Sequence, residues 1–530
     1  WSSAGCFDAL ESLVSTYGAG GRWPTMWLAI GQTLGYDGAD LDPAVLHRLE
    51  TLQSLAAPVD LESEIGAYAF VNEWSRPHRK GADYQAEVAE LREHVFALGR
   101  SLASDPGLFE RLAPQIWATR VTPVAWLGYG YAESSGDLEA LVDMLIQSFR
   151  AHAPDRAGVE FIEGGLSAIA KRNPALLPRV QEKLLSEPGL KPYSVWLLLA
   201  TPITPWVSAR LVDVARAGTV PAGHFESVGH GRRHESMSDA EFASLTNAVC
   251  DLPGGYHSAF DMLVMRLHTR ADWNYTPGPE IFSAIRAALK HLLVDRDTES
   301  NRSNRHGIGP LIVEALGPGA HDDEAAELVA MFCEGLKEYR LSWADFSEVA
   351  SAIIQARPEM LLDALLDLER DDPESDVVDW VFRRRSGESS PSLNVVPIDQ
   401  LLAWCGEDPQ RQQLVARNIR IYEATDGAAD DGDSPSPVRL SQHFKKLLEV
   451  MSDKASLVES AVAEAVPSSW MNSRVPTIEA RQQALRELLG HESSEVATLV
   501  AEKVATLGRR IELERRHEES EHHAREQRFE

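Results

Sequence analysis

Short amphipathic segments with helical spacing, separated by tight turns, recur between residues 173 and 268. This recurrence constrains the fold more than any other feature of the chain. Each predicted helix carries one apolar stripe that it cannot bury alone, so stacked neighbours have to bury it. The stripes are Leu177, Val180 and Leu184; Val207, Leu211 and Val214; Phe242, Leu245 and Val249; and Leu263, Val264 and Leu267. The predicted unit is helix, short turn, helix.

Helix start and stop signals support these boundaries. Asn173-Pro174 and Thr204-Pro205 each place a capping side chain before a proline, which the first helical turn tolerates. Ser238-Asp-Ala-Glu241 matches a capping box, and Gly218 suits a left-handed C-cap. The cap-proline pair also occurs at Asp42, Asp105, Asp372 and Asp408. Its irregular intervals favour a degenerate helical array over an exact short repeat.

Apolar stripes elsewhere extend the helical prediction to the whole chain. They are Tyr84, Val88, Leu91, Val95 and Leu98; Ile281, Phe282, Ile285, Leu289 and Leu292; and Leu328, Val329, Phe332 and Leu336. The residues up to Trp74 predict four short helices. The glycine-punctuated run from Trp126 to Tyr131 is expected to separate two helices. Little sheet is expected, because no segment shows sustained period-two alternation.

We therefore predict an all-α fold, an α-solenoid of irregular HEAT- or TPR-like helix pairs with a long charged C-terminal helix. A chain of 530 residues is too long for one ordinary core. The predicted parts are an N-terminal helical region (1–150), a central helical-repeat array (151–424), an acidic Ser/Pro linker (425–437) and a C-terminal helical region with a charged tail (438–530). The last helix is expected from Ser494, with a packed first half and a second half that projects or frays.

Charge and cysteine content bound the setting of the protein. Lysine and arginine total 51 against 80 acidic residues, a net charge of −29, which disfavours a nonspecific nucleic-acid or anionic-membrane surface. The sequence shows neither a signal peptide nor a membrane span. Cys6, Cys250, Cys333 and Cys405 are far apart, and three lie in apolar helical patterns typical of reduced core thiols. We expect a cytoplasmic chain without a cofactor and, since Trp1 is not Met, a fragment of a larger protein.

One group of histidines is the densest set of candidate metal ligands. His224, His230 and His234 lie within eleven residues, and the last two share a helical face if that segment is helical. The glycines that flank His230 and the arginine pair at 232–233 argue against a cation site. A polar loop is the favoured interpretation, and a metal-dependent hydrolase at these histidines remains an alternative. The run from His517 to His523 matches neither zinc-protease pattern.

Two groups of arginines are candidate contacts for a partner or an anion. One group precedes a Gly-Ile-Gly-Pro turn that lacks the phosphate-loop pattern, and the other follows an apolar segment, where cations complement a helix C-terminus. The residues are Arg302 and Arg305, and Arg383, Arg384 and Arg385. A nucleic-acid-binding arm built on them is a second alternative, which the strongly negative surroundings disfavour. No Gly-x-Ser-x-Gly elbow nominates a nucleophile, so no catalytic residue is assigned.

Several short runs carry a resemblance to a known family. They are Arg474–Arg481, Leu485–Leu489, the closing Arg-Glu-Gln-Arg-Phe-Glu, Ser238–Phe242 and Met265–His268. With the helical texture of the chain, they resemble the helical-repeat regions that follow the ATPase module in STAND-type (NACHT-like) bacterial defence proteins. The resemblance implies a sensor or scaffold arm that binds a foreign protein, such as a phage protein, and controls oligomerisation of a larger parent chain. ATPase activity is not carried over, because the sequence has no Walker motif.

The expected function is therefore noncatalytic recognition and scaffolding. Stacked helix pairs create a long surface suited to binding a protein partner. Nucleic acid is disfavoured as a partner, and no membrane contact is expected.

Overall fold

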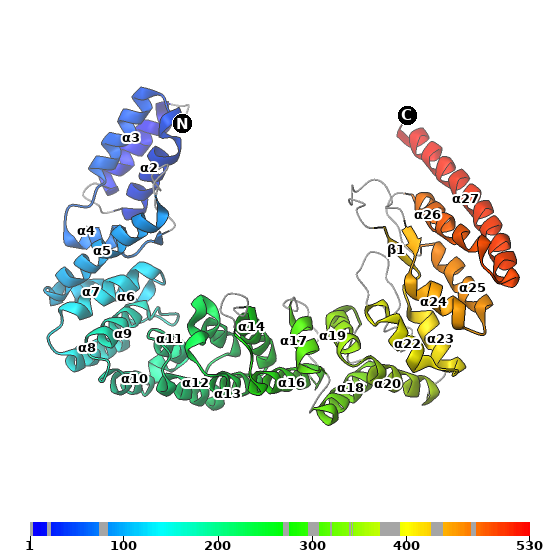
Figure 1. The fold of residues 1–530 in the computed structure, drawn as a ribbon. Coiled ribbons are helices and arrows are strands. Elements are labelled where there is room, and N and C mark those ends of the chain that lie inside the picture. The colour runs from blue at the N-terminus through cyan, green and yellow to red at the C-terminus, as the bar shows by residue number, and fades with distance from the viewer. Residues whose placement is uncertain are drawn as a thin grey trace. The chain divides into compact units, whose positions relative to one another are not determined.

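The computed structural model describes residues 4–18, 23–73, 83–268, 275–294, 307–317, 321–338, 341, 343–371, 393–425, 438–467 and 473–529. These residues form an all-α helical-repeat fold with one short two-stranded sheet, which confirms the predicted fold class. The chain divides into two compact units, Trp1–Ile281 and Phe282–Glu530 (Figure 1). This division does not coincide with the predicted boundaries near residues 150, 424 and 438, which stay predictions.

The first unit opens with the four short helices that the sequence predicts. They are α1 (Ala4–Leu13), α2 (Pro24–Asp37), α3 (Pro43–Leu55) and α4 (Leu61–Tyr68), with a π-turn η1 (Val14–Gly18) and a 3-10 turn η3 (Gly38–Asp40). The Asp42 side chain caps α3 by accepting a hydrogen bond from the Ala44 amide at 2.8 Å, as predicted. The apolar residues of α1, α2 and α3 meet in a small core around Leu49, whereas Ile65 of α4 belongs to the larger core of the following helices.

From residue 84 on, the helices of the first unit alternate between two layers. They are α5 (Tyr84–Ala103), α6 (Pro106–Ala118), α7 (Thr122–Ser134), α8 (Leu138–His152), α9 (Glu160–Arg172), α10 (Leu177–Leu185) and α11 (Ser194–Leu199). α5, α7, α9 and α11 pack in succession in one layer, and α6, α8 and α10 in the other (Figure 1). The core between the layers contains the fully buried rings of Trp117 and Phe161.

The remaining elements of the first unit include those around the candidate site. They are the 3-10 turn η5 (Pro188–Tyr193), α12 (Pro205–Ala217), the 3-10 turns η6 (Ala222–Val228) and η7 (His230–Ser236), α13 (Asp239–Cys250) and α14 (Gly255–His268). Thr204 caps α12, and Gly218 ends it with a φ of 62°. Ser238 and Glu241 form the predicted capping box of α13. These local predictions are confirmed.

The second unit repeats the two-layer arrangement. It contains most of α16 (Pro279–Val294), then α17 (Ile308–Ala315), α18 (Asp322–Lys337), α19 (Trp343–Ala356), α20 (Pro358–Asp371), η9 (Leu393–Val395), α22 (Ile398–Cys405), α23 (Pro409–Asn418), β1 (Tyr422–Ala424), β2 (Val438–Leu440), α24 (Gln442–Val450), α25 (Lys454–Ala465), α26 (Val475–Leu485), η10 (Arg486–Gly490) and α27 (Ser494–Phe529). α18, α20, α23, α25 and α27 pack in succession, while α17 packs on α19 and α22 on α24.

The predicted linker at 425–437 begins and ends on paired strands. β1 and β2 are antiparallel, with Tyr422 opposite Leu440 and Ala424 opposite Val438. The two ends of the segment are therefore held side by side, while residues 426–437 themselves lie outside the described residues. The cap-proline pair at Asp372 also lies outside them.

Ion pairs and hydrogen bonds between side chains link each repeat to the next. Many of them join residues some 40 positions apart in the sequence: Arg100 and Glu133 are 33 positions apart, and Lys503 and Glu459 are 44 apart. Further links of this kind join Arg150 to Glu187, Arg286 to Glu324, Arg370 to Gln410, Lys445 to Glu487 and Arg474 to Glu514. A separation of about 40 residues is that of HEAT-type repeats, so each repeat contacts its nearest neighbours.

Arginine side chains also close helix C-termini in the preceding repeat. Arg172 donates to the carbonyl oxygens of Ala132 and Ser135 at 2.6 and 2.9 Å, at the end of α7. Arg357 donates to the carbonyls of Leu316 and Gly317 at 2.6 and 2.9 Å, just after α17. The last carbonyls of a helix lack partners within it, and a cation there also complements the helix dipole.

The glycine-rich run at 126–131 lies inside α7, so the prediction that it separates two helices is wrong. A Cβ on Gly130 would lie 2.1 Å from the Phe96 carbonyl oxygen in α5, and a Cβ on Gly128 would lie 2.1 Å from that of Phe161 in α9. Gly164 of α9 packs in the same way, with a Cβ 1.7 Å from the Ala125 oxygen. Glycine is present because neighbouring backbones touch.

The predicted cap at Asn173 is also wrong. Asn173 ends α9, where its amide donates to the Ile169 carbonyl at 2.8 Å, and α10 begins only at Leu177. The proline in the first turn of α10 is Pro178, so the chain makes a turn over 173–176 that the local pattern does not distinguish from a helix start.

Most residues of the predicted stripes are buried, whereas others, such as Val88, Val264 and Leu267, are only half-buried, and the last helix is longer than its apolar part. Val496, Val500, Leu507 and Ile511 of α27 are buried. Beyond them, Glu514 and Glu518 bind Arg474 and Ser473 at the start of α26. The second half of α27 is thus helical, with polar links in place of apolar ones.

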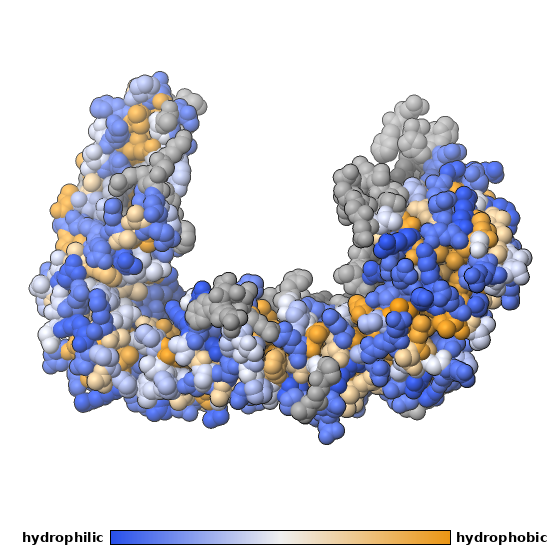
Figure 2. Space-filling model, viewed as in Figure 1, coloured by the Kyte–Doolittle hydropathy of each residue, from blue (hydrophilic) through white to orange (hydrophobic). Residues whose placement is uncertain are grey.

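Three cysteines lie in the core, and the surface is mostly hydrophilic on the face shown in Figure 2. Cys250, Cys333 and Cys405 are buried free thiols, as predicted, and burial raises the pKa of the first two to about 12. Figure 2 shows hydrophilic residues over most of the visible face, with hydrophobic residues gathered over α22–α25. In the described part of the chain, no helix has both the length and the apolar character needed to cross a membrane.

Gly164→Ala tests the close packing of α7 and α9. Alanine normally favours a helix over glycine by about 1 kcal/mol, but here its methyl group would meet the backbone of Ala125. We expect the free energy of unfolding to fall by about 2–3 kcal/mol, measured by urea denaturation. Gly136→Ala is the control, because a Cβ there has no atom within 4 Å. Equal stability of the two variants would contradict the close approach.

Candidate functional site

The three candidate metal-binding histidines lie in different surroundings. His224 in η6 stacks on Trp196 with ring centroids 4.1 Å apart. His230 is exposed, whereas the His234 ring is 0% exposed and packs against Phe242. Among the described residues, no group of three or more His, Cys, Asp or Glu side chains is placed to hold a metal ion. The structure therefore does not bring these histidines together as a metal site.

The backbone of η7 explains why His230 and His234 do not share a helical face. Gly231 and Arg232 both have positive φ angles, 62° and 63°, which interrupt the turn between the two histidines. Burial lowers the pKa of His234, and the nearby Arg266 guanidinium lowers it further. His234 is thus a core residue beneath the loop, with the Arg266 guanidinium beside its ring.

The arginine candidates cannot be placed. Arg302 and Arg305, and Arg383, Arg384 and Arg385, all lie outside the described residues. The partner, anion and nucleic-acid contacts assigned to them stay predictions.

The turn that follows Arg302 and Arg305 does lead into a helix, as expected. Its amides are already bonded: Glu348 of α19 accepts hydrogen bonds from the Gly307 and Gly309 amides at 3.1 and 2.9 Å. A carboxylate of the protein itself therefore occupies the helix N-terminus where a bound anion would otherwise be stabilised. This arrangement agrees with the absence of a phosphate-loop pattern.

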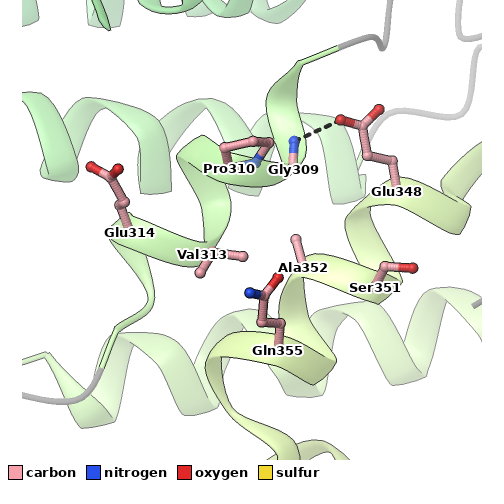
Figure 3. Close-up of a pocket in the computed structure, with 8 residues that line it drawn as sticks. All are labelled: Gly309, Pro310, Val313, Glu314, Glu348, Ser351, Ala352 and Gln355. Carbon is pink, nitrogen blue, oxygen red and sulfur yellow. Dashed lines mark hydrogen bonds between the residues drawn. The ribbon is translucent and has the colours of Figure 1, made fainter. Parts of the chain in front are cut away.

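A groove of about 340 Å³ runs between α17 and α19 (Figure 3). We call it the α17–α19 groove; it is lined by Gly309, Pro310, Val313, Glu314, Glu348, Ser351, Ala352 and Gln355. Val313, Ala352 and the Gln355 amide lie toward its middle, with Glu314 and Glu348 at opposite ends (Figure 3). Its floor is apolar and its ends are acidic.

A second hollow lies in the first unit, beside η7. We call it the η7 pocket; it has a volume of about 400 Å³ and is lined by Thr201, Pro202, Ile203, Arg232, Arg233, Glu235 and Ser236. Arg232 pairs with Glu235 across the turn. Residues 201–203 follow shortly after α11 in the chain. The packing of α11 on α9 therefore positions this wall of the pocket.

Two carboxyl groups at the start of α9 have perturbed acidity next to this region. Burial, together with the charge of Glu160, raises the pKa of Glu163 to about 7, against a smaller opposing effect of Arg233. Burial also raises the pKa of Glu160, whose Oε2 atom is buried without a hydrogen-bond partner. Sequence reasoning does not single out either residue. The only available signal is an acidic pair at i, i+3 on an otherwise buried helix.

Comparisons with known proteins do not identify a family. No protein-family model matches the chain, and a search of curated proteins finds no matching sequence. The function therefore has to be argued from the described residues themselves.

Glu163→Gln tests the buried carboxyl group through the pH dependence of stability. A folded-state pKa of about 7, above the ordinary 4.5, means that the native protein holds this proton more tightly than the unfolded chain. Wild-type stability is then lost as the pH rises from about 4.5 to about 7. The variant lacks this loss, so relative to wild type its stability should improve by up to about 3 kcal/mol between pH 5 and pH 8.

Urea denaturation at the two pH values measures this difference. Glu90→Gln on the exposed face of α5 is the charge-matched control and should show no such change. A Glu163→Gln variant whose stability relative to wild type is the same at both pH values would contradict the assignment.

Proposed function

We propose that the chain is a noncatalytic helical-repeat region that recognises and scaffolds a protein partner. The observation that carries the proposal is the two-layer stack, in which helices use their apolar stripes on nearest neighbours about 40 residues away. Such a stack exposes a long outer surface with little chemistry of its own. Extended surfaces of this kind serve protein binding in repeat proteins.

The α17–α19 groove supports the proposal as a place where the surface is hollowed. Its floor of Pro310, Val313 and Ala352 offers apolar area, and Ser351 and the Gln355 amide add polar groups to its lining. Small side chains let a partner approach the helices closely, and a mixture of apolar centre and polar rim is usual for interfaces.

The wider setting of the proposal rests on the sequence resemblance alone. In that setting the chain is the sensor arm of a larger, cytoplasmic, defence-type protein of bacteria, and its partner is a foreign protein. Neither a metal-dependent hydrolase nor a nucleic-acid-binding arm is favoured by a described side-chain group, since the histidines do not converge and the five arginines are not placed.

Gln355→Arg tests the groove as a contact surface. Gln355 is exposed on α19 and lines the groove, so a larger cationic side chain obstructs it without entering the core. We expect partner capture, measured by quantitative mass spectrometry on pull-downs from lysate of the source organism, to fall by about tenfold. Circular dichroism and the unfolding midpoint should stay unchanged.

Gln147→Arg provides the matched control, because Gln147 is exposed in α8 of the first unit and does not line the groove. It should capture the same protein as wild type. Undiminished capture by Gln355→Arg would remove the groove from the interface. Failure of wild type to enrich any protein over empty beads would count against the recognition function as a whole.

A further inference from the structure

The η7 pocket presents two arginines from a backbone that is unusual for them. Arg232 has a φ of 63°, and it is the only non-glycine residue with a positive φ in the described part of the chain. A residue with a side chain is strained in the left-handed region, whereas glycine adopts it freely. Gly231, immediately before it, has the same conformation. The strained turn brings Arg232 and Arg233 to the wall of a single pocket.

The turn is anchored on both sides, so the arginines project from a rigid frame. Ser236 donates a hydrogen bond to the Ile203 carbonyl at 3.1 Å, which joins η7 to the opposite wall of the pocket. Arg266, which is itself buried, donates to the carbonyls of His234 and Met237. The buried His234 ring lies beneath the same turn. Little ordering is then required when a ligand binds.

Charge within the pocket is positive although the chain as a whole is strongly negative. Arg232 is paired with Glu235, whose side chain is only 11% exposed. The Arg233 side chain has no hydrogen bond or ion pair among the described residues. Glu163 is near enough to sense its charge, but burial raises the pKa of that carboxyl group to about 7, so it neutralises Arg233 incompletely at neutral pH. Two guanidinium groups and one carboxylate give the pocket wall a formal net charge of +1.

We propose that the η7 pocket binds the side-chain carboxylate of an acidic segment of the protein partner. The inference rests on the proposed recognition function and names the chemistry of one contact. Arg233 supplies the fork of donors that matches a carboxylate. Pro202 offers an apolar wall for the methylene groups of a Glu side chain. A net charge of +1 matches one carboxylate, whereas a phosphate monoester carries about −1.5 to −2 charges.

The binding test uses defined peptides and the full chain. Fluorescently labelled acetyl-Gly-Glu-Leu-Glu-Gly-amide and its Gln counterpart are titrated with the protein at constant ionic strength, and anisotropy reports the dissociation constants. We expect the Glu peptide to bind about tenfold more tightly than the Gln peptide. The net charge of −29 repels the Glu peptide more than the Gln peptide. Tighter binding of the Glu peptide would therefore indicate a local cationic site.

Two pocket variants and one control locate the binding. Arg233→Gln should weaken binding of the Glu peptide about tenfold. Arg216→Gln removes the same charge from an exposed position in the last turn of α12 and should bind like wild type. Arg232→Gly should also weaken binding, while the unfolding midpoint should change little, because relief of the left-handed strain offsets the loss of the Arg232–Glu235 ion pair. A purely structural arginine would instead lower the midpoint when replaced.

Each outcome decides for or against the pocket. Equal binding of the Glu and Gln peptides, or equal loss in Arg233→Gln and Arg216→Gln, would overturn the proposal. Competition by inorganic phosphate at lower concentration than by acetate would overturn the carboxylate assignment and identify a phosphate site. The recognition function is tested separately by partner capture. If Arg233→Gln captures the partner like wild type, the pocket is not part of that interface, and the proposed function still stands.

Discussion

The structure depends on one requirement, that every helix bury its apolar stripe against the next repeat. Within each unit the requirement produces two layers in which a helix packs on the helix two steps along the chain, as α5, α7 and α9 do. In the first unit, α7 packs so closely on α5 and on α9 that their backbones touch. Glycines in these three helices permit this contact, because they carry no Cβ atom. Charged groups are left for the ends and edges, where arginines close helix C-termini and ion pairs join neighbouring repeats.

The η7 region departs from this pattern of economical packing. Several helices in the first unit begin at a local side-chain cap, such as Thr204 or the Ser238–Glu241 box, which lowers the free energy of the fold. η7 instead keeps Arg232 in a left-handed conformation and is fastened by the long-range bonds of Arg266 and Ser236. The strain at Arg232 lowers the stability of the fold, and the surrounding bonds keep the residue in this conformation. Such strain is typical of sites where the position of a side chain matters more than stability.

The sequence groups the histidines and the arginines because similar side chains lie close together along the chain. The arginines lie outside the described residues, and of the histidines His234 enters the core while His230 stays exposed. The residues that shape the η7 pocket come from two segments some 30 residues apart, 201–203 and 232–236. The α17–α19 groove likewise joins residues from two helices. No spacing rule connects such positions, because the contacts exist only after the helices have packed.

The sequence by itself determined the all-α class, the helix starts at Asp42, Thr204 and Ser238, and most of the buried stripe positions. These follow from local physics: Asp42, Thr204 and Ser238 bond amides at most three residues away, and an apolar stripe is visible at a spacing of three or four. Tertiary structure alone decided that the glycines at 128 and 130 lie inside α7, that Asn173 ends a helix, and that Arg232 and Arg233 line a pocket. Those outcomes depend on how closely segments far apart in the chain pack on one another. Local hydrogen bonds and helical spacing carry no information about that packing.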